Sequence, residues 1–195
     1  MAPLTRADIL DRKAFEAVRP QHQAEVIAAK AVRRVPLGEH FTFLFENRTT
    51  ILWQIHEMCR VEGIEGDAID HELATYNALL PGPDSLSATL LIEYVDPEVR
   101  DAELRRLVGL HEHVFLDIDG VAPVYARFDD QQFNPERISS VQFLRFALSD
   151  EARDGFMDMR RGARLVVDHP VYQAQIELPR ATRGALIDDL EEAAR

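Results

Sequence analysis

Residues 113–128 have the sequence HVFLDIDGVAPVYARF, and this stretch decides the fold class. Two segments with strand character, His113–Ile118 and Val121–Phe128, are separated only by the dipeptide Asp119-Gly120. An Asp-Gly pair favours the tight turn of a β-hairpin, whose two strands are antiparallel. The stretch therefore predicts an antiparallel sheet.

The rest of the C-terminal half alternates strands with helices, because the hydrophobic period changes after Pro83 from about 3.6 residues to about 2. Further strands are predicted at Ala88–Val95, Val141–Leu148, Leu165–Asp168 and Gln173–Leu178. Helices are predicted at Glu98–Leu107, Asp150–Arg160 and Thr182–Ala194. We therefore expect an α+β fold, in which N-terminal helices pack on a mainly antiparallel sheet of about five or six strands with a C-terminal helix.

Caps, prolines and glycines divide the N-terminal half into four predicted helices. They are expected at residues 5–13, 20–34, 48–62 and 67–80. Thr5 is a suitable N-cap for the first helix, and Pro20 is placed to open the second. Asn47 caps the third helix and Gly63 ends it, while Phe41–Phe45 alternates as a short strand-like segment before it.

Length and charge predict one domain with three regions. The chain has 195 residues, which fits a single domain over 1–195. We divide it into a basic helical arm (1–40), a helical hairpin (41–82) and an α+β sheet region (83–195). The arm holds seven basic and five acidic residues, whereas the whole chain carries a net charge of −12.

Several classes of protein are disfavoured by composition. A net charge of −12 repels a phosphate backbone, so nucleic-acid binding is not expected. The longest apolar run, Val26–Ala29, is far too short for a membrane span or a signal peptide, so a soluble, cytoplasmic protein is expected. Cys59 is the single cysteine, which excludes an intrachain disulfide. The usual phosphate-loop, dinucleotide, hydrolase and zinc-protease motifs are absent.

The first candidate site is a polar stripe along the predicted helix 48–62. Glu46, Thr50, Gln54 and Glu57 recur every three or four residues, so they share one side of a helix. Such a stripe could ligate a hard metal ion or accept hydrogen bonds from a polar ligand. The alternative is a solvated helix face with a capped N-terminus.

The second candidate is a His-x-His pair at the start of a predicted strand. His111 and His113 are candidate ligands for zinc, iron or copper. Asp117 and Asp119 follow on the same strand face, but they lie too far along the strand to join one metal sphere. The alternative is a solvated sheet face.

The third candidate is Arg145, which shares a strand face with apolar residues. A partly buried arginine needs a carboxylate or another acceptor, and Glu93 on a predicted strand is the expected partner. The alternative is an arginine that receives an anionic ligand in a bidentate manner. His169 could serve as an acid or base, or it could be a turn histidine bonded to Asp168.

Short segments along the whole chain resemble a bacterial family, the domain of unknown function 3501. The matching segments are Val35-Pro36-Leu37-Gly38, Phe45-Glu46-Asn47 with Gln54, Glu57-Met58-x-Arg60-x-Glu62, Glu72-Leu73 with Tyr76-Asn77 and Pro81, Ala88-Thr89 with Glu93, Phe143-Leu144-Arg145-Phe146, and His169-Pro170 with Tyr172. Genes of this family often neighbour those of a rubrerythrin-like di-iron protein and an iron–sulfur oxidoreductase. The resemblance thus implies a role beside peroxide or redox handling, with these proteins as partners.

The polar residues within the matching segments are the candidate ligand-binding residues. They are Glu46, Gln54, Glu57, Tyr76, Asn77, Glu93, Arg145 and His169. We expect a binding or accessory protein of a redox system; the alternatives are a metal- or small-ligand-dependent enzyme with a Glu/Asn/Arg/His pocket, and a structural homodimer. No cofactor is predicted. Convergence of Glu57, Asn77 and Arg145 in one cavity would favour the enzyme, and separate partners would favour the accessory protein.

Overall fold

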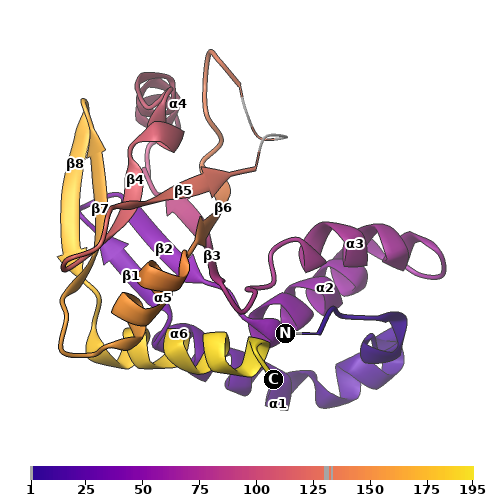
Figure 1. Cartoon of the computed structure of the whole chain (residues 1–195). Helices are drawn as coiled ribbons and strands as arrows, with labels where there is room; N and C mark the ends of the chain where they lie inside the picture. The colour runs from indigo at the N-terminus through magenta and orange to yellow at the C-terminus, as the bar shows by residue number, and fades with distance from the viewer. Residues whose placement is uncertain (1, 130–131, 133) are drawn as a thin grey trace.

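One antiparallel sheet, curved into a nearly closed barrel, dominates the computed structural model, which describes residues 2–129, 132 and 134–195 (Figure 1). Within these residues it has eight strands in the order β1-β2-β3-β6-β5-β4-β7-β8. The strands are β1 (Arg34–Leu37), β2 (Phe41–Phe45), β3 (Ser85–Ile92), β4 (Val114–Ile118), β5 (Val124–Phe128), β6 (Val141–Ala147), β7 (Ala163–His169) and β8 (Tyr172–Glu177).

Helices form a separate N-terminal part and cover parts of the barrel. Helices α1 (Arg12–Ala31), α2 (Arg48–Glu62) and α3 (Ala68–Asn77) lie together beside the sheet (Figure 1). The others are α4 (Pro97–Arg106), α5 (Asp150–Met157) and α6 (Arg180–Ala193), with two short 3-10 turns, η1 (Arg6–Asp8) and η2 (Leu110–Glu112). Among the described residues, no helix is both long and apolar enough to cross a membrane.

The α+β class is confirmed, but five or six strands is an underestimate. The unpredicted strand β1 is short and contains Pro36, which lacks the N–H that a central strand needs. Such a strand is tolerated because β1 stands at one end of the strand order. The strand-like segment Phe41–Phe45 pairs with both β1 and β3, so it is a full member of the sheet.

The helices predicted at residues 5–13 and 20–34 are replaced by the short turn η1 and by one long helix, α1, and Arg34 already belongs to β1. Helix α1 begins after its N-cap Asp11 and continues through Pro20 to Ala31. A proline inside a helix costs about 3 kcal/mol, since it removes a hydrogen bond and crowds the preceding turn. Phe15 and Val26 are buried on either side of Pro20, and their packing offsets this cost. Thr5 instead precedes η1, where its backbone N–H and its hydroxyl bond the Asp8 carboxylate.

Helix α2 begins and ends as predicted. The Asn47 side chain accepts a hydrogen bond from the Thr50 N–H, and Gly63 ends the helix in the left-handed conformation at φ 65°. Both signals are local, because an N-cap satisfies a free N–H of the first turn and glycine adopts positive φ at little cost.

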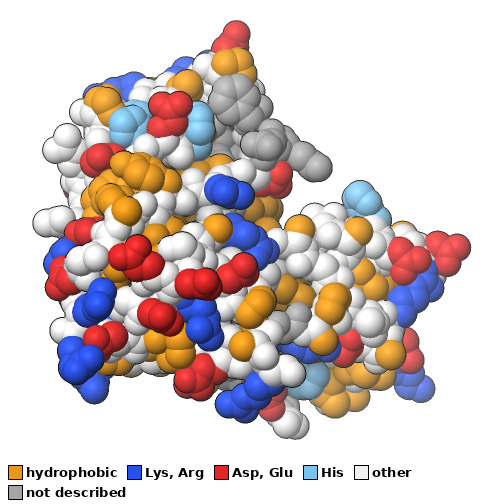
Figure 2. Space-filling view, in the orientation of Figure 1, with side chains coloured by type: hydrophobic (Ala, Val, Ile, Leu, Met, Phe, Trp, Pro, Cys, Tyr) orange, Lys and Arg blue, Asp and Glu red, His pale blue; other side chains and the backbone are white. Residues whose placement is uncertain are grey.

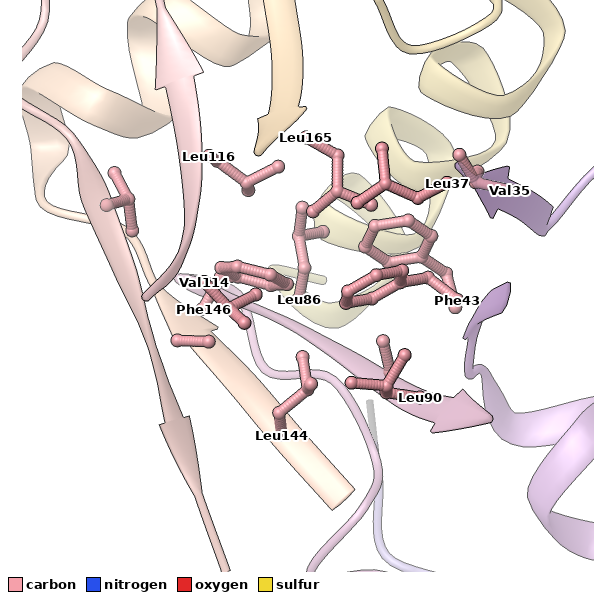
Figure 3. Packing of buried hydrophobic residues seen from close by; sticks show 14 of the residues in the cluster. Val35, Leu37, Phe43, Leu86, Leu90, Val114, Leu116, Leu144, Phe146 and Leu165 are labelled. Atoms are coloured by element: carbon pink, nitrogen blue, oxygen red, sulfur yellow. The ribbon is translucent and has the colours of Figure 1, made fainter. Parts of the chain in front are cut away.

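The barrel interior holds the main hydrophobic core. Side chains from strands on opposite sides of the barrel point toward one another, among them Phe43, Leu90, Phe146 and Leu165 (Figure 3). A second, smaller cluster lies between the N-terminal helices and contains Ile51, Ile55 and Leu73 among others. The chain therefore has two separate hydrophobic cores, one inside the barrel and one among the N-terminal helices.

Tyr172 joins the two ends of the strand order. Its hydroxyl donates to the Leu37 carbonyl oxygen at 2.7 Å and accepts from the His40 N–H at 3.2 Å. Its ring stacks on Phe41 with centroids 3.9 Å apart. Gly38, at φ 67°, leaves room for this hydroxyl, since a Cβ there would lie 2.5 Å from the Tyr172 oxygen. These contacts hold β1 against β8.

Candidate functional site

A row of residues on the outer face of the sheet forms the floor of a cavity. Strand register places Arg34 opposite Leu44, Leu44 opposite Thr89, and Thr89 opposite Phe143. Because directly opposed residues share a sheet face, the row runs across β1, β2, β3 and β6. All four residues line one cavity of about 280 Å³.

Helices α2 and α3 supply the walls of this cavity. Three of the predicted ligand-binding residues meet there: Glu46 just before α2, Gln54 on α2 and Tyr76 on α3. Lys30, near the end of α1, also lines the cavity. The site thus lies between the helical part of the chain and the outside of the barrel. We call it the Glu46 cavity.

The Glu46 carboxylate is buried and is held by two hydroxyl groups. Glu46 is 8% exposed, and its oxygens accept hydrogen bonds from Thr50 and, at 2.7 Å, from Thr89. The N-terminus of α2 favours negative charge nearby. Within the described chain no arginine, lysine or histidine forms an ion pair with Glu46. Its direct partners in the described chain are therefore hydroxyl groups rather than a cation.

Two basic side chains line the same cavity. Neither Lys30 nor Arg34 has a carboxylate within ion-pair distance among residues 2–129, 132 and 134–195. Arg34 is two strands away from Thr89, which corresponds to about 10 Å between their Cα atoms. The described lining of the cavity therefore carries one carboxylate and two basic side chains that are not ion-paired with it.

Gln54 and Tyr76 are contributed by two different helices. Gln54 lines the cavity from α2 and Tyr76 lines it from α3. Burial raises the pKa of Tyr76, so the hydroxyl stays protonated and can still donate a hydrogen bond. The two side chains can therefore serve as neutral polar contacts for a ligand.

Glu57, predicted for the same site, faces another part of the surface. Its carboxylate accepts hydrogen bonds from Arg19 at 2.8 Å and from Arg60 at 3.0 Å. These two guanidinium groups lower the pKa of Glu57 to about 2. Arg19 also lies over the Trp53 ring, 5.6 Å from its centroid. This arrangement ties α1 to α2 and leaves Glu57 outside the Glu46 cavity.

Asn77 and Arg145 hold chain segments in place. The Asn77 side chain bonds both the N–H and the carbonyl oxygen of Leu4, which fixes the N-terminal segment on α3. Arg145 donates to the carbonyl oxygens of Ala78 and Leu80 at the end of α3, and to the Ser85 hydroxyl. The convergence of Glu57, Asn77 and Arg145 considered above does not occur.

The predicted pairing of Arg145 with Glu93 is wrong. Glu93 accepts a hydrogen bond from the Thr42 hydroxyl at 2.7 Å, because Thr42 lies on the neighbouring strand β2. Carbonyl oxygens at the end of a helix carry partial negative charge, and they replace the expected carboxylate as acceptors for Arg145.

The three candidate histidines, His111, His113 and His169, have different surroundings. His169 is bonded to the Val108 carbonyl oxygen, and burial lowers the pKa of its ring. Asp168 pairs with His113 at 3.0 Å rather than with His169. His111 belongs to η2 and packs on Phe128. In the described part of the chain, no group of three or more His, Cys, Asp or Glu could hold a metal ion.

Sequence reasoning missed Lys30, Arg34 and Thr89 as members of the site. Thr89 lies in one of the segments that carry the family resemblance, so its hydroxyl was available as a signal. Lys30 and Arg34 gave no signal for this cavity, because the pairing of β1 with β2 brings Arg34 to it and the last turn of α1 brings Lys30.

Comparison with known proteins places this architecture in a family. Residues 3–190 match the family model described as "Protein of unknown function (DUF3501)". The chain belongs to this family. A crystal structure of a "novel protein of unknown function" from Burkholderia pseudomallei K96243 is 40% identical to this DUF3501 chain, with a TM-score of 0.90. The match covers 96% of this chain and 99% of that one. No curated protein gives a match.

Proposed function

We propose that this protein binds a small polar molecule in the Glu46 cavity, with Glu46 as the acceptor for a cationic or hydrogen-bond-donating group. The observation that carries the proposal is the buried Glu46 carboxylate, which has two hydroxyl partners and no ion pair within the described chain. Burying a carboxylate is costly unless it is paired, so a complementary group of a ligand would stabilise it.

The bonding capacity of Glu46 supports a ligand. An ionised carboxylate offers about four lone-pair positions, and the Thr50 and Thr89 hydroxyls occupy one on each oxygen. A hydrogen-bond donor on the ligand would use the lone-pair positions of Glu46 that remain. Lys30 and Arg34 favour an acidic group at the other side, so a small molecule carrying both kinds of group fits the charges.

Cavity size and composition narrow the class of ligand. The volume of about 280 Å³ lies at the lower limit of small-molecule sites, so the ligand has few heavy atoms. Glu46 is the one carboxylate among the described lining residues, whereas hard metal ions require several oxygen ligands. The geometry therefore favours an organic molecule over a bound cation.

Binding is favoured over catalysis by the positions of the other candidates. Glu57, Asn77 and Arg145 each have structural partners of their own, at three different places. That separation supports a binding or accessory protein.

The proposal is tested by thermal unfolding of the full chain in the presence of small amines, amides, carboxylates and amino acids. At least one compound with a donor group is expected to raise the Tm of the wild type and not that of Glu46→Gln. Glu93→Gln is the matched control, because Glu93 also bonds a threonine hydroxyl but lies outside the cavity. If no compound acts, or if Glu46→Gln responds like the wild type, the proposal fails.

A second variant guards against misfolding of Glu46→Gln. Leu91 lines the cavity without bonding Glu46, so Leu91→Phe narrows the space while leaving the carboxylate and its hydroxyl partners intact. It is expected to abolish the thermal shift as well.

The association with a rubrerythrin-like protein and an iron–sulfur oxidoreductase stays a prediction from the family resemblance. The cytoplasmic location stays a prediction from the short apolar runs of the sequence. Affinity capture from native cells under mild conditions tests the association; recovery of neither partner would contradict it. The homodimer also stays a prediction. Light scattering at increasing concentration tests it, since a constant mass of 22.2 kDa would exclude a dimer.

A further inference from the structure

A second hollow lies beside the Glu46 cavity, between α3 and strands β5 and β6. It has a volume of about 520 Å³ and shares Leu79 and Phe143 with the Glu46 cavity. Figure 2 shows a notch between the sheet and the helical part, with Lys or Arg side chains on the sheet side and a histidine on the helical side. We call this hollow the interlobe cleft.

Two arginines stand side by side on the sheet wall of the interlobe cleft. Strand register places Arg127 of β5 directly opposite Arg145 of β6, and both line the cleft. Like charges directly opposite one another destabilise a sheet. An anion between the two guanidinium groups would reduce their mutual repulsion and thus this destabilisation.

The two arginines differ in how their charges are balanced. Arg145 uses three N–H groups for Ser85, Ala78 and Leu80, so two of the five donors of its guanidinium remain. Arg127 is exposed and forms no ion pair within the described chain. The pair therefore retains donors and positive charge that the described protein groups do not use.

The remaining lining is consistent with an excess of positive charge. His71 lines the cleft from α3, and Asp129 is the one carboxylate among the described lining residues. Two arginines against one aspartate give this described lining a positive charge, whereas the whole chain carries a net charge of −12. Because the rest of the protein is acidic, a local cationic cleft is selective for small anions over nucleic acid.

We propose that the interlobe cleft binds an anionic oxygen group of a small molecule, a phosphate or a carboxylate, between Arg127 and Arg145. The planar guanidinium of Arg127 carries parallel N–H donors and can bond two oxygens of such a group, while Arg145 adds a single donor from the two that remain to it. This site is distinct from the Glu46 cavity, and binding here does not require a ligand there.

The test is calorimetric titration of the full chain with inorganic phosphate, pyrophosphate, acetate and succinate at constant ionic strength. Arg127→Gln is the informative variant, because Arg127 holds no other segment in place, whereas Arg145 fastens the end of α3. Arg180→Gln is the matched control, since Arg180 is exposed on α6, away from the cleft.

We expect the wild type to bind at least one of these anions, and Arg127→Gln to weaken that binding at least about tenfold, the usual effect of losing one charged hydrogen bond. Arg180→Gln and Glu46→Gln should bind as the wild type does. Tighter binding of the phosphates would indicate a phosphorylated ligand, and tighter binding of the carboxylates an organic acid. The absence of binding, or equal binding by wild type and Arg127→Gln, would overturn the proposal.

Discussion

At the scale of single residues, the clearest consequence concerns Glu57 and pH. Its pKa is lowered from 4.5 to about 2 by hydrogen bonds from Arg19 and Arg60. A carboxylate whose pKa is lower in the folded state stabilises the fold above its unfolded pKa. That contribution is present above about pH 4.5 and is lost as the pH falls toward 2.

Replacing Glu57 tests this account. Glu57→Gln should lower the free energy of unfolding at pH 7 by about 1–2 kcal/mol, a value reduced for the partial exposure of the pair. Urea unfolding at several pH values should show the difference from wild type shrinking between pH 7 and pH 3. A difference that stays constant over this range would mean that Glu57 contributes by packing alone.

At the scale of secondary structure, local signals identified most elements, and Pro20 marks their limit. Asn47 and Gly63 set the ends of α2 through contacts within a few residues, so its bounds could be predicted. Pro20 lies where a helix can begin, but burial of Phe15 and Val26 keeps α1 continuous through it. Tertiary packing of this kind is not encoded in the local sequence.

Pro20→Ala is expected to raise the free energy of unfolding. Restoring a helical hydrogen bond is favourable, while alanine gives the unfolded chain more freedom, so the net gain should be about 1–2 kcal/mol. Urea unfolding of the variant measures it. A loss of stability would show that the proline ring itself makes contacts that the fold needs.

At the scale of the whole molecule, the contact of Tyr172 with Leu37 and His40 links the two ends of the nearly closed barrel. Tyr172→Phe leaves two backbone groups without this partner and should cost about 1–3 kcal/mol. Gly38→Ala should also destabilise, since its Cβ would meet the Tyr172 hydroxyl and φ is positive. The double variant should lose less free energy of unfolding than the two single variants together, by at least about 0.5 kcal/mol. The reason is that Tyr172→Phe removes the oxygen with which the Cβ introduced by Gly38→Ala would clash. Strict additivity in urea unfolding would contradict this.

The candidate site was predictable only where its residues share one element. Glu46 and Gln54 recur at helical spacing, so the sequence predicts them on one side of a helix, and Glu46 in fact lies just before α2. Tyr76 joins them through the packing of α3 on α2, and Thr89 and Arg34 join through strand pairings distant in the chain. The register of a sheet depends on all of its strands, so the floor of the cavity emerges only from the assembled molecule.

The most direct test of the central claim, a small polar ligand in the Glu46 cavity, is a two-dimensional NMR titration of backbone amides. The titrant is the compound that gives the largest thermal shift. We predict that the perturbed amides cluster at Glu46, Thr50, Gln54, Tyr76 and Thr89, and that Glu46→Gln abolishes these changes. Perturbations that cluster elsewhere, or that persist unchanged in Glu46→Gln, would contradict the claim.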